Sequence, residues 1–169
     1  MLDGMQDLMK GLSELLGSTG NLQSSVEKYV KENADLHRRL DEAMAERIKN
    51  LSQTLIKKAR EVNGVKVVEL KGINMPEVVK DLAFTIRKDC PEHTVFVGAT
   101  MSPEKKPLLT VMLSDDIVKT GANAGQIVRE AAKLIKGGGG GQPFFAQAGG
   151  KDIEGLSAAF DKIFELLAL

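Results

Sequence analysis

The chain has little of what several common functions need. Its 169 residues include no tryptophan, one tyrosine and one cysteine. So few aromatic side chains make extensive stacking of RNA bases on a strand platform unlikely to be its main activity. The single cysteine, Cys90, excludes an internal disulfide and fits a reducing compartment. A membrane-spanning helix needs about 18 consecutive apolar residues, and no apolar run in this sequence approaches that length. The N-terminal start is acidic and lacks the positive charge of a secretory signal. We therefore expect a cytoplasmic protein with no membrane partner.

An excess of charge of either sign is also absent. Lys plus Arg and Asp plus Glu number 23 each, which leaves a formal net charge of zero. The balance holds locally, since residues 1–63 carry ten charges of each sign and residues 64–169 carry thirteen. Any contact with nucleic acid must then come from a local patch and not from the field of the whole protein.

Carboxylates are plentiful, but histidine and cysteine, which most zinc sites require, are scarce. The two histidines, His37 and His93, are far apart in the sequence, so a zinc site is not expected. Asp115 and Asp116 could bind a cation, but the sequence Ser-Asp-Asp after an apolar run is more typical of a helix cap. Cys90 ends a helical pattern, and we expect it to be a small, buried or half-buried apolar residue. We predict that this segment has no catalytic residues, no metal site and no cofactor of its own.

Apolar residues recur every three or four positions through the first third of the chain. Residues 2–16 predict one amphipathic helix, which residues 17–21 end, and residues 22–62 predict a second helix without proline or glycine. At about 1.5 Å per residue the second helix would be roughly 60 Å long. The first helix, folded back as a hairpin, can cover only part of it.

The uncovered stripe of the long helix predicts self-association. Its early spacing alternates three and four, as in coiled coils, and Asn33 stands where one polar residue can set the register of paired helices. The predicted dimerisation residues are Val26, Tyr29, Asn33, Leu36, Leu40, Met44, Ile48, Leu51 and Leu55. In the alternative interpretation, the helix packs entirely against the C-terminal half of its own chain.

The period of the apolar pattern changes after Gly64. Strands are predicted at residues 65–70, 94–99 and 108–113, the last two joined as a hairpin, and helices at residues 76–90, 123–135 and 153–169, with Met75-Pro76 opening the first. The prediction is an α/β fold. A helical hairpin with a long coiled-coil-like helix forms a dimerisation arm at residues 1–63, and a two-layer α/β domain with a small mixed sheet follows at residues 64–169.

Five consecutive glycines, residues 137–141, require an explanation, because each glycine costs roughly 0.5–1 kcal/mol relative to alanine in a regular element. Glycine is useful where the backbone needs a positive φ, or where another chain or a ligand approaches closer than a side chain allows. A flexible linker is the alternative, although Phe144 and Phe145 follow at once. The sequence fits neither the phosphate-loop pattern nor G-x-G-x-x-G, so nucleotide hydrolysis is not supported.

Binding of a phosphate backbone is a use that suits the glycines. Free backbone N–H groups can form an anion-binding concavity, and Pro143 could open a short helix whose amides add to it. Phe144 and Phe145 either stack on bases or fix the loop to the core. The predicted RNA-binding residues are Arg129, Lys133, Lys136, Gly137, Gly138, Gly139, Gly140, Gly141, Gln142, Gln147, Gly149, Gly150 and Lys151.

The same residues carry a family resemblance. Residues 137–150, GGGGGQPFFAQAGG, resemble the signature G-G-x-G-G-[RQ]-P-x-x-A-Q-[AG]-G-G near the C-terminus of bacterial alanyl-tRNA synthetases. Residues 113–116 and 125–132 resemble the segments before that signature, and residues 26–36 are similar to the linking helices of that family. The resemblance extends over essentially the whole chain and implies the C-terminal domain of such an enzyme, a DHH-associated fold behind a helical dimerisation arm.

The resemblance implies a function for the segment. In that family the enzyme attaches alanine to its tRNA with ATP and magnesium, and a separate zinc-bearing editing domain removes mischarged amino acids. Neither module has a counterpart here, so the resemblance implies a non-enzymatic fragment. Its implied role is to bind the outer corner of tRNA(Ala), to form a homodimer through the arm, and to couple aminoacylation with editing alongside the remaining domains of the synthetase.

Two departures from the family pattern bear on binding. Many members have arginine where this chain has Gln142, which removes a potential phosphate partner. Phe144-Phe145 replaces a more polar pair, which shifts the balance from charge toward packing or stacking. Two alternatives stay open: the substrate domain of a DHH-type phosphoesterase, whose glycine motif needs a histidine where Gln142 stands, and a pure protein-interaction module.

Overall fold

The structure is a computed structural model that describes residues 2–17, 20–72 and 76–169. The chain divides into two compact units, Met1–Glu46 and Arg47–Leu169. The predicted helix boundaries at Ser18, Thr19 and Met75 lie outside the described residues. The elements are, in chain order, α1 (Leu2–Leu15), α2 (Leu22–Lys57), β1 (Arg60–Val62), β2 (Val65–Lys71), α3 (Pro76–Asp89), β3 (Thr94–Met101), β4 (Pro107–Leu113), α4 (Asp115–Lys119), α5 (Ala124–Ala132), the 3₁₀ turn η1 (Lys133–Ile135), β5 (Gly138–Gln142), β6 (Phe145–Gly149) and α6 (Leu156–Leu167).

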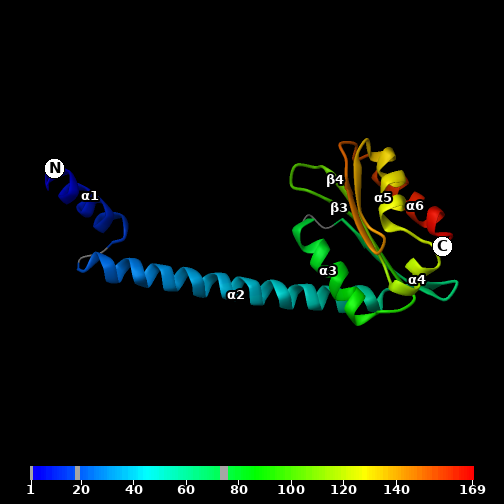
Figure 1. Cartoon of the computed structure of the whole chain (residues 1–169), viewed down its shortest axis with the longest axis horizontal. Helices are drawn as coiled ribbons and strands as arrows, with labels where there is room; N and C mark the ends of the chain where they lie inside the picture. Colours follow the sequence, from blue (N-terminus) through cyan, green and yellow to red (C-terminus); the bar gives the residue numbers. More distant parts are fainter. Residues whose placement is uncertain (1, 18–19, 73–75) are drawn as a thin grey trace. The chain divides into compact units, whose positions relative to one another are not determined.

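The first unit consists of α1 and the first part of α2 (Figure 1). Asn21 begins α2, because its side-chain oxygen accepts a hydrogen bond from the backbone N–H of Gln23 at 2.9 Å. Tyr29 donates its hydroxyl hydrogen to the carbonyl oxygen of Leu16 at 3.1 Å and so ties α2 to the end of α1. The two helices predicted from the apolar spacing are therefore confirmed.

The first unit has no buried residue among those that the structure describes between 4 and 46. The apolar stripes of both helices face solvent, and Leu15 is 84% exposed. The exposed large apolar residues of this unit are Met5, Leu8, Met9, Leu12, Leu15, Val26, Tyr29, Val30, Leu36 and Leu40. Tertiary packing within the chain therefore contributes little to the stability of these helices.

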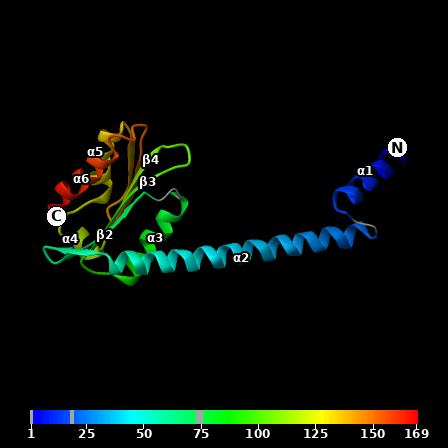
Figure 2. The same cartoon turned by 180° about the vertical axis from the view of Figure 1, so that it is seen from behind.

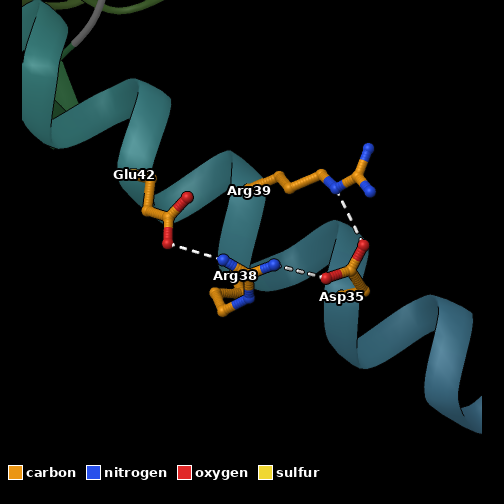
Figure 3. A network of polar contacts seen from close by, with 4 residues as sticks. All are labelled: Asp35, Arg38, Arg39 and Glu42. Carbon is orange, nitrogen blue, oxygen red and sulfur yellow. Dashed lines mark hydrogen bonds and ion pairs between the residues drawn. The ribbon is translucent and has the colours of Figure 1, made fainter.

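The polar face of α2 carries a network of ion pairs (Figure 3). Arg38 bridges Asp35, at 2.6 Å, and Glu42, at 2.8 Å, and Arg39 pairs with the second oxygen of Asp35 at 2.8 Å. The hydrogen bonds with Asp35 and then Glu42 raise the pKa of Arg38. Pairs three and four residues apart support a helix only modestly when they are exposed, so this network stabilises α2 locally without replacing a core.

The second unit is built on a six-stranded mixed sheet with the order β1-β2-β3-β4-β6-β5. The β2–β3 pair is parallel and the other four pairs are antiparallel. In Figure 1, α5 and α6 lie on one side of the strands and α3 on the other, and the reverse view in Figure 2 agrees. The predicted α/β class and mixed sheet are confirmed, but the domain has three layers and not the predicted two, because helices cover both faces of the sheet.

Each face of the sheet has its own core. One core joins β3 and β4 to α5 and α6 through buried residues such as Val97, Val111, Val128 and Ile163. The other core joins β2, β3 and β4 to α3 and includes Phe96 and Met112, which are fully buried. Because β3 is buried on both faces, its sequence reads as a continuous apolar run without alternation.

The end of the long helix differs from the prediction. Helix α2 ends at Lys57, and Arg60–Val62 forms strand β1, so the predicted continuation of the helix to Val62 is wrong. Asn63 and Gly64 both have positive φ, 52° and 80°, as in a two-residue hairpin turn. This turn places Val62 opposite Val65. Residues 60–62 form a strand and not a continuation of the helix, because their backbone pairs with the edge of β2.

The last turns of α2 cover the core on the α3 side. Ile48, Leu51 and Leu55 are partly buried against that core. These three residues belong to the predicted dimerisation stripe, but their apolar surface is used within their own chain. For this part of α2 the alternative interpretation holds, whereas Val26, Tyr29, Leu36 and Leu40 stay exposed.

Candidate nucleic-acid interface

The glycine run forms strand β5 of the sheet. Gly138 to Gln142 pair antiparallel with β6, with Gly138 opposite Gly149 and Gln142 opposite Phe145. Pro143 and Phe144 make the two-residue connection. The prediction of a loop with a row of free amides is therefore wrong, and so is the short helix at Pro143. The linker alternative is excluded too, since a flexible linker would not form a paired strand.

The glycines are required because the hairpin strands lie very close to each other. A Cβ atom at Gly137 would stand 2.0 Å from the carbonyl oxygen of Gly149, and one at Gly139 would stand 2.2 Å from that of Gln147. Gly138, between them, has nothing within 4 Å of its Cβ position. Close approach, the second of the two predicted uses, therefore applies, but the approaching chain is β6 of the same protein.

Helix α5 fixes the hairpin from one side. The N–H of Ala124 donates to the carbonyl oxygen of Pro143 at 2.8 Å, and the N–H of Gly137 donates to that of Ala132 at 3.0 Å. The Arg129 guanidinium lies 3.4 Å from the Cβ position of Gly140, midway along β5. As the outermost strand, β5 keeps one edge free of strand pairing, and all its residues except Gly140 are exposed.

A groove of about 700 Å³ opens at the base of the hairpin. One wall is the β3–β4 loop and the other is the hairpin base. Its lining residues are Ser102, Pro103, Glu104, Lys106, Pro107, Leu108, Lys136, Gly137, Gly138, Gly149, Gly150 and Lys151. The loop at residues 102–106 is absent from the predicted site. Its Lys105-Lys106 pair between two prolines is a signal in the sequence that could have pointed to it.

Three lysines contribute positive charge to this groove. Lys136 pairs with Asp152 at 2.8 Å; this hydrogen bond raises the pKa of Lys136 and lowers the pKa of Asp152. Lys106 pairs with Glu104, and that bond lowers the pKa of Glu104. Lys151 has no ion-pair partner within the described part of the chain. Because exposed ion pairs are weak, an incoming anion can compete for all three ammonium groups.

The structure separates the predicted RNA-binding residues into groups. Lys136, Lys151 and the paired glycines at residues 137–138 and 149–150 line the groove together. Lys133 does not line it and pairs with Glu130 at 2.6 Å. Gln147 is engaged inside the sheet, where its side-chain nitrogen donates to the hydroxyl of Thr110 at 3.0 Å.

One further predicted RNA-binding residue, Gln142, lies at the opposite end of the hairpin, beside the two phenylalanines for which either base stacking or core packing was predicted. Gln142 precedes the turn, and Phe145, partly buried, packs against the core on the α3 side, so core packing of at least one of the two phenylalanines is confirmed. Phe144 is half-buried. Phe84 and Arg87 contact Phe144 from α3, and neither belongs to the predicted RNA-binding residues.

Asp115 and Asp116 lie in the first turn of α4, with Ser114 as the N-cap residue. Asp116 accepts a hydrogen bond from the N–H of His93 at 2.9 Å and contacts its Nδ1 at 2.7 Å. Burial alone would raise the pKa of Asp116, but the hydrogen bonds from Ser114 and the His93 backbone outweigh it and lower that pKa. Asp115 pairs with Arg87. The helix-start role is therefore favoured over cation binding.

The described residues contain no group of three or more metal-ligating side chains. Cys90 is half-buried, as predicted, with the Lys66 ammonium 3.8 Å from its sulfur. Within the described ranges, no helix combines the length and the apolar character needed to cross a membrane.

The chain resembles known proteins in its domain family, in its sequence and in its fold. The sequence model of the DHHA1 domain matches residues 62–169. Over the whole chain, the sequence is 45% identical to an alanine–tRNA ligase of Bacteroides fragilis and 43% identical to that of Bacteroides thetaiotaomicron, and covers 19% of each. The crystal structure of the C-Ala domain from Aquifex aeolicus alanyl-tRNA synthetase is 27% identical, with a TM-score of 0.57; the match covers 66% of this chain and 98% of that domain.

The chain spans about a fifth of the length of the curated relatives that it matches. The solved alanyl-tRNA synthetase domain that it resembles is the C-Ala domain and not the catalytic region. These similarities confirm the resemblance carried by residues 137–150.

Proposed function

Because the chain belongs to the DHHA1 domain family, we propose that it is the C-terminal, tRNA-binding and dimerising part of a cytoplasmic alanine–tRNA ligase. The identity of 45% to such a ligase over the whole chain supports this proposal. The ligand is the outer corner of tRNA(Ala). By holding the tRNA there, the domain keeps one tRNA bound while the remaining domains, with their ATP, magnesium and zinc, aminoacylate and edit it.

One observation carries the RNA-binding part of the proposal: a groove with three lysines, one wall of which is the all-glycine base of the hairpin. The lysines Lys106, Lys136 and Lys151 attract phosphate groups without base specificity. The exposed glycine backbone of β5 lets a polynucleotide approach the main chain more closely than any side chain would allow. Arg129, beside Gly140, adds a fourth cation along the strand.

The test is binding of tRNA(Ala) to the chain across a series of salt concentrations. Replacing Lys106, Lys136 and Lys151 together with alanine should weaken binding at low salt, and it should reduce the slope of log affinity against log salt by up to about three. A control with the same change of charge replaces Lys57, Lys58 and Lys119, which are exposed and outside the groove. Equal slopes in both triple variants would remove the groove from the RNA site.

Dimerisation through the arm is the second part of the proposal. The exposed stripe at Val26, Tyr29, Leu36 and Leu40 is too apolar to face water along a whole helix without a partner, and Asn33 lies within it. Because the end of α2 covers a core of the second unit, deleting the arm would also damage that unit. Point variants are therefore the better test.

Sedimentation of the whole chain tests the arm. We expect a dimer for the unchanged chain and a monomer for the double variant Leu36→Asp, Leu40→Asp. The control Lys31→Asp, Glu46→Lys changes charges on the same helix without touching the stripe. A dimer that survives the double variant would place the interface elsewhere.

A further inference from the structure

A cluster of three aromatic rings lies at the tip of the β5–β6 hairpin, at the opposite end from the lysine groove. The ring of Phe84, on α3, stands 5.0 Å from that of Phe145 and 6.5 Å, edge to face, from that of Phe144. Phe145 belongs to the core, but Phe84 is 37% exposed. An aromatic ring that is anchored on its inner side thus presents its outer side to solvent.

Arg87, one helical turn after Phe84, is held in a fixed orientation. Its guanidinium lies 4.3 Å from the centre of the Phe144 ring, and one of its nitrogens bonds the carboxylate of Asp115. A guanidinium plane stacked on a ring and bonded to a carboxylate loses little further freedom when a ligand binds. Only 24% of the Arg87 side chain is exposed.

Phe84, Arg87 and Asp115 line a pocket of about 360 Å³, together with Lys88 and Pro91. Lys88 is exposed and has no ion-pair partner within the described ranges. The pocket therefore combines an aromatic ring, a preorganised guanidinium, an ammonium group and a carboxylate. A single exposed ring with several charges is poor in apolar area for a protein interface, whose centre is depleted of charged residues. The same set suits a flat, polar ring that is attached to a phosphate.

We propose that this pocket binds one unpaired nucleobase of an RNA. The base stacks on Phe84 beside the Arg87 guanidinium, Lys88 contacts a flanking phosphate, and Asp115 accepts a hydrogen bond from an exocyclic amino group. Cytosine offers such a group at N4, whereas uracil offers none, so the pocket favours cytosine over uracil. This inference rests on the proposed RNA-binding function and adds a base-reading site to it.

The pocket adjoins the tip of the β5–β6 hairpin through Phe144 and Phe145, and the lysine groove lies at the base of the same hairpin. Gly138 lines the groove and Gln142 adjoins the turn at Phe144, and the four residue steps between them, at about 3.4 Å each, place the two ends of β5 roughly 14 Å apart. One RNA can therefore contact both, with its backbone along the bare edge of β5. The groove supplies affinity without base preference, and the pocket supplies the preference.

The experiment measures binding of fluorescently labelled oligocytidylate and oligouridylate, and of tRNA(Ala), to the whole chain by anisotropy. Phe84→Ala should weaken binding of oligocytidylate roughly five- to hundred-fold and leave the salt slope unchanged. Phe84→Trp should retain binding, because it keeps a stacking surface. Asp115→Asn should reduce the preference for cytosine. The matched control is Ile153→Ala, since Ile153 is 38% exposed and does not line the pocket.

Thermal unfolding of each variant shows whether a loss of binding comes from misfolding. Phe84→Trp then tests stacking itself, because it keeps an aromatic surface. If the Trp variant folds but does not bind oligocytidylate, stacking on this ring is contradicted. Unchanged oligonucleotide binding by Phe84→Ala would overturn the inference. If tRNA binding depends on the lysines and not on Phe84, the inference fails while the proposed function stands. If oligocytidylate binds through Phe84 and tRNA does not bind, the proposed function fails and the pocket stands. A chain that binds neither RNA overturns both.

Discussion

The two units use amphipathic sequence in opposite ways. In Arg47–Leu169 the apolar residues form two cores, one on each face of the sheet. In Met1–Glu46 the apolar stripes remain exposed, and no described residue from 4 to 46 is buried. The same periodicity therefore marks a helix that covers its own protein and a helix that offers a surface to something else.

Helix α2 contains both cases along one continuous stripe. Leu51 and Leu55 pack against a core of the second unit, while Leu36 is 64% exposed. The pattern of spacing is alike at both ends, so the difference lies in whether a sheet and a second helix stand opposite. The stripe alone does not distinguish a core-facing helix from one that awaits a partner.

Removing a large apolar side chain should have the largest effect on the free energy of unfolding, and we expect this effect only in the second unit. Phe96→Ala, in a fully buried position, is expected to lower the free energy of unfolding by about 3–5 kcal/mol. Leu36→Ala, in the arm, should change the free energy of unfolding of the globular unit by less than about 0.5 kcal/mol. Chemical denaturation followed by circular dichroism measures both. Comparable losses would mean that the arm and the globular unit unfold together.

Adding a methyl group to β5 should have an intermediate effect that alternates along the strand. Gly139→Ala places a Cβ atom against the backbone of β6 and should cost about 1–3 kcal/mol of stability. Gly138→Ala, with open space around its Cβ position, is the matched control and should be nearly neutral. Equal losses at the two positions would contradict the close strand approach as the reason for the glycines.

Hydrogen exchange should distinguish the two units by its dependence on protein concentration. The amides of residues 22–46 gain little protection from packing within the chain, so we expect their exchange to slow as a dimer forms at higher concentration. Ile127 and Val128, in α5, are buried. Their amides should exchange at a rate that does not depend on protein concentration. A concentration-independent rate in the arm would argue against self-association.

A smaller loss of stability is expected in the second unit when the pH is lowered. The pKa of Asp116 is lowered in the fold, so its contribution to stability is complete above its ordinary value, about 3.8, and is lost as the pH falls through the lower, folded pKa. Asp116→Asn should therefore flatten the fall of stability between pH 5 and pH 2, roughly the range of carboxylate titration. Asp81→Asn, which removes an exposed carboxylate, serves as the control. Melting curves across this range provide the measurement.

The smallest effect is expected from the ion pairs of the arm. Arg38→Ala removes its bonds to Asp35 and Glu42 and should slightly reduce the helical signal at low salt. The difference should disappear at high salt, because exposed pairs are screened. Lys31→Ala is the control, since Lys31 has no ion pair in the described part of α2. A difference that persists in high salt would point to a packing role for the Arg38 side chain.

Local pattern predicted most of the fold. The helices at α1, α3, α5 and α6 and the β3–β4 hairpin follow from apolar spacing and from turn residues. Strand β1 was missed because three residues after a long helical pattern carry too little periodicity to reveal a strand. The Asn63-Gly64 turn was the available signal.

The candidate site was predicted only in part. Lys136, Lys151 and the glycines at its base were found, because the motif keeps them close in sequence. Lys106 reaches the same groove from the β3–β4 loop, about 30 residues away along the chain. Lys133 lies next to the motif in sequence but pairs with Glu130 outside the groove.

The sequence by itself determined where the helices and most strands form and which family the chain resembles, because these depend on periodicity and on a contiguous motif. The tertiary structure alone decided that the glycines form an outer strand, that only part of the α2 stripe is covered, and that Phe84 and Arg87 meet Phe144. The physical reason is that each feature depends on contacts between segments distant along the chain: the pairing of β6 with β4 places the glycine hairpin at the sheet edge, and α3 packs against both the end of α2 and the hairpin turn.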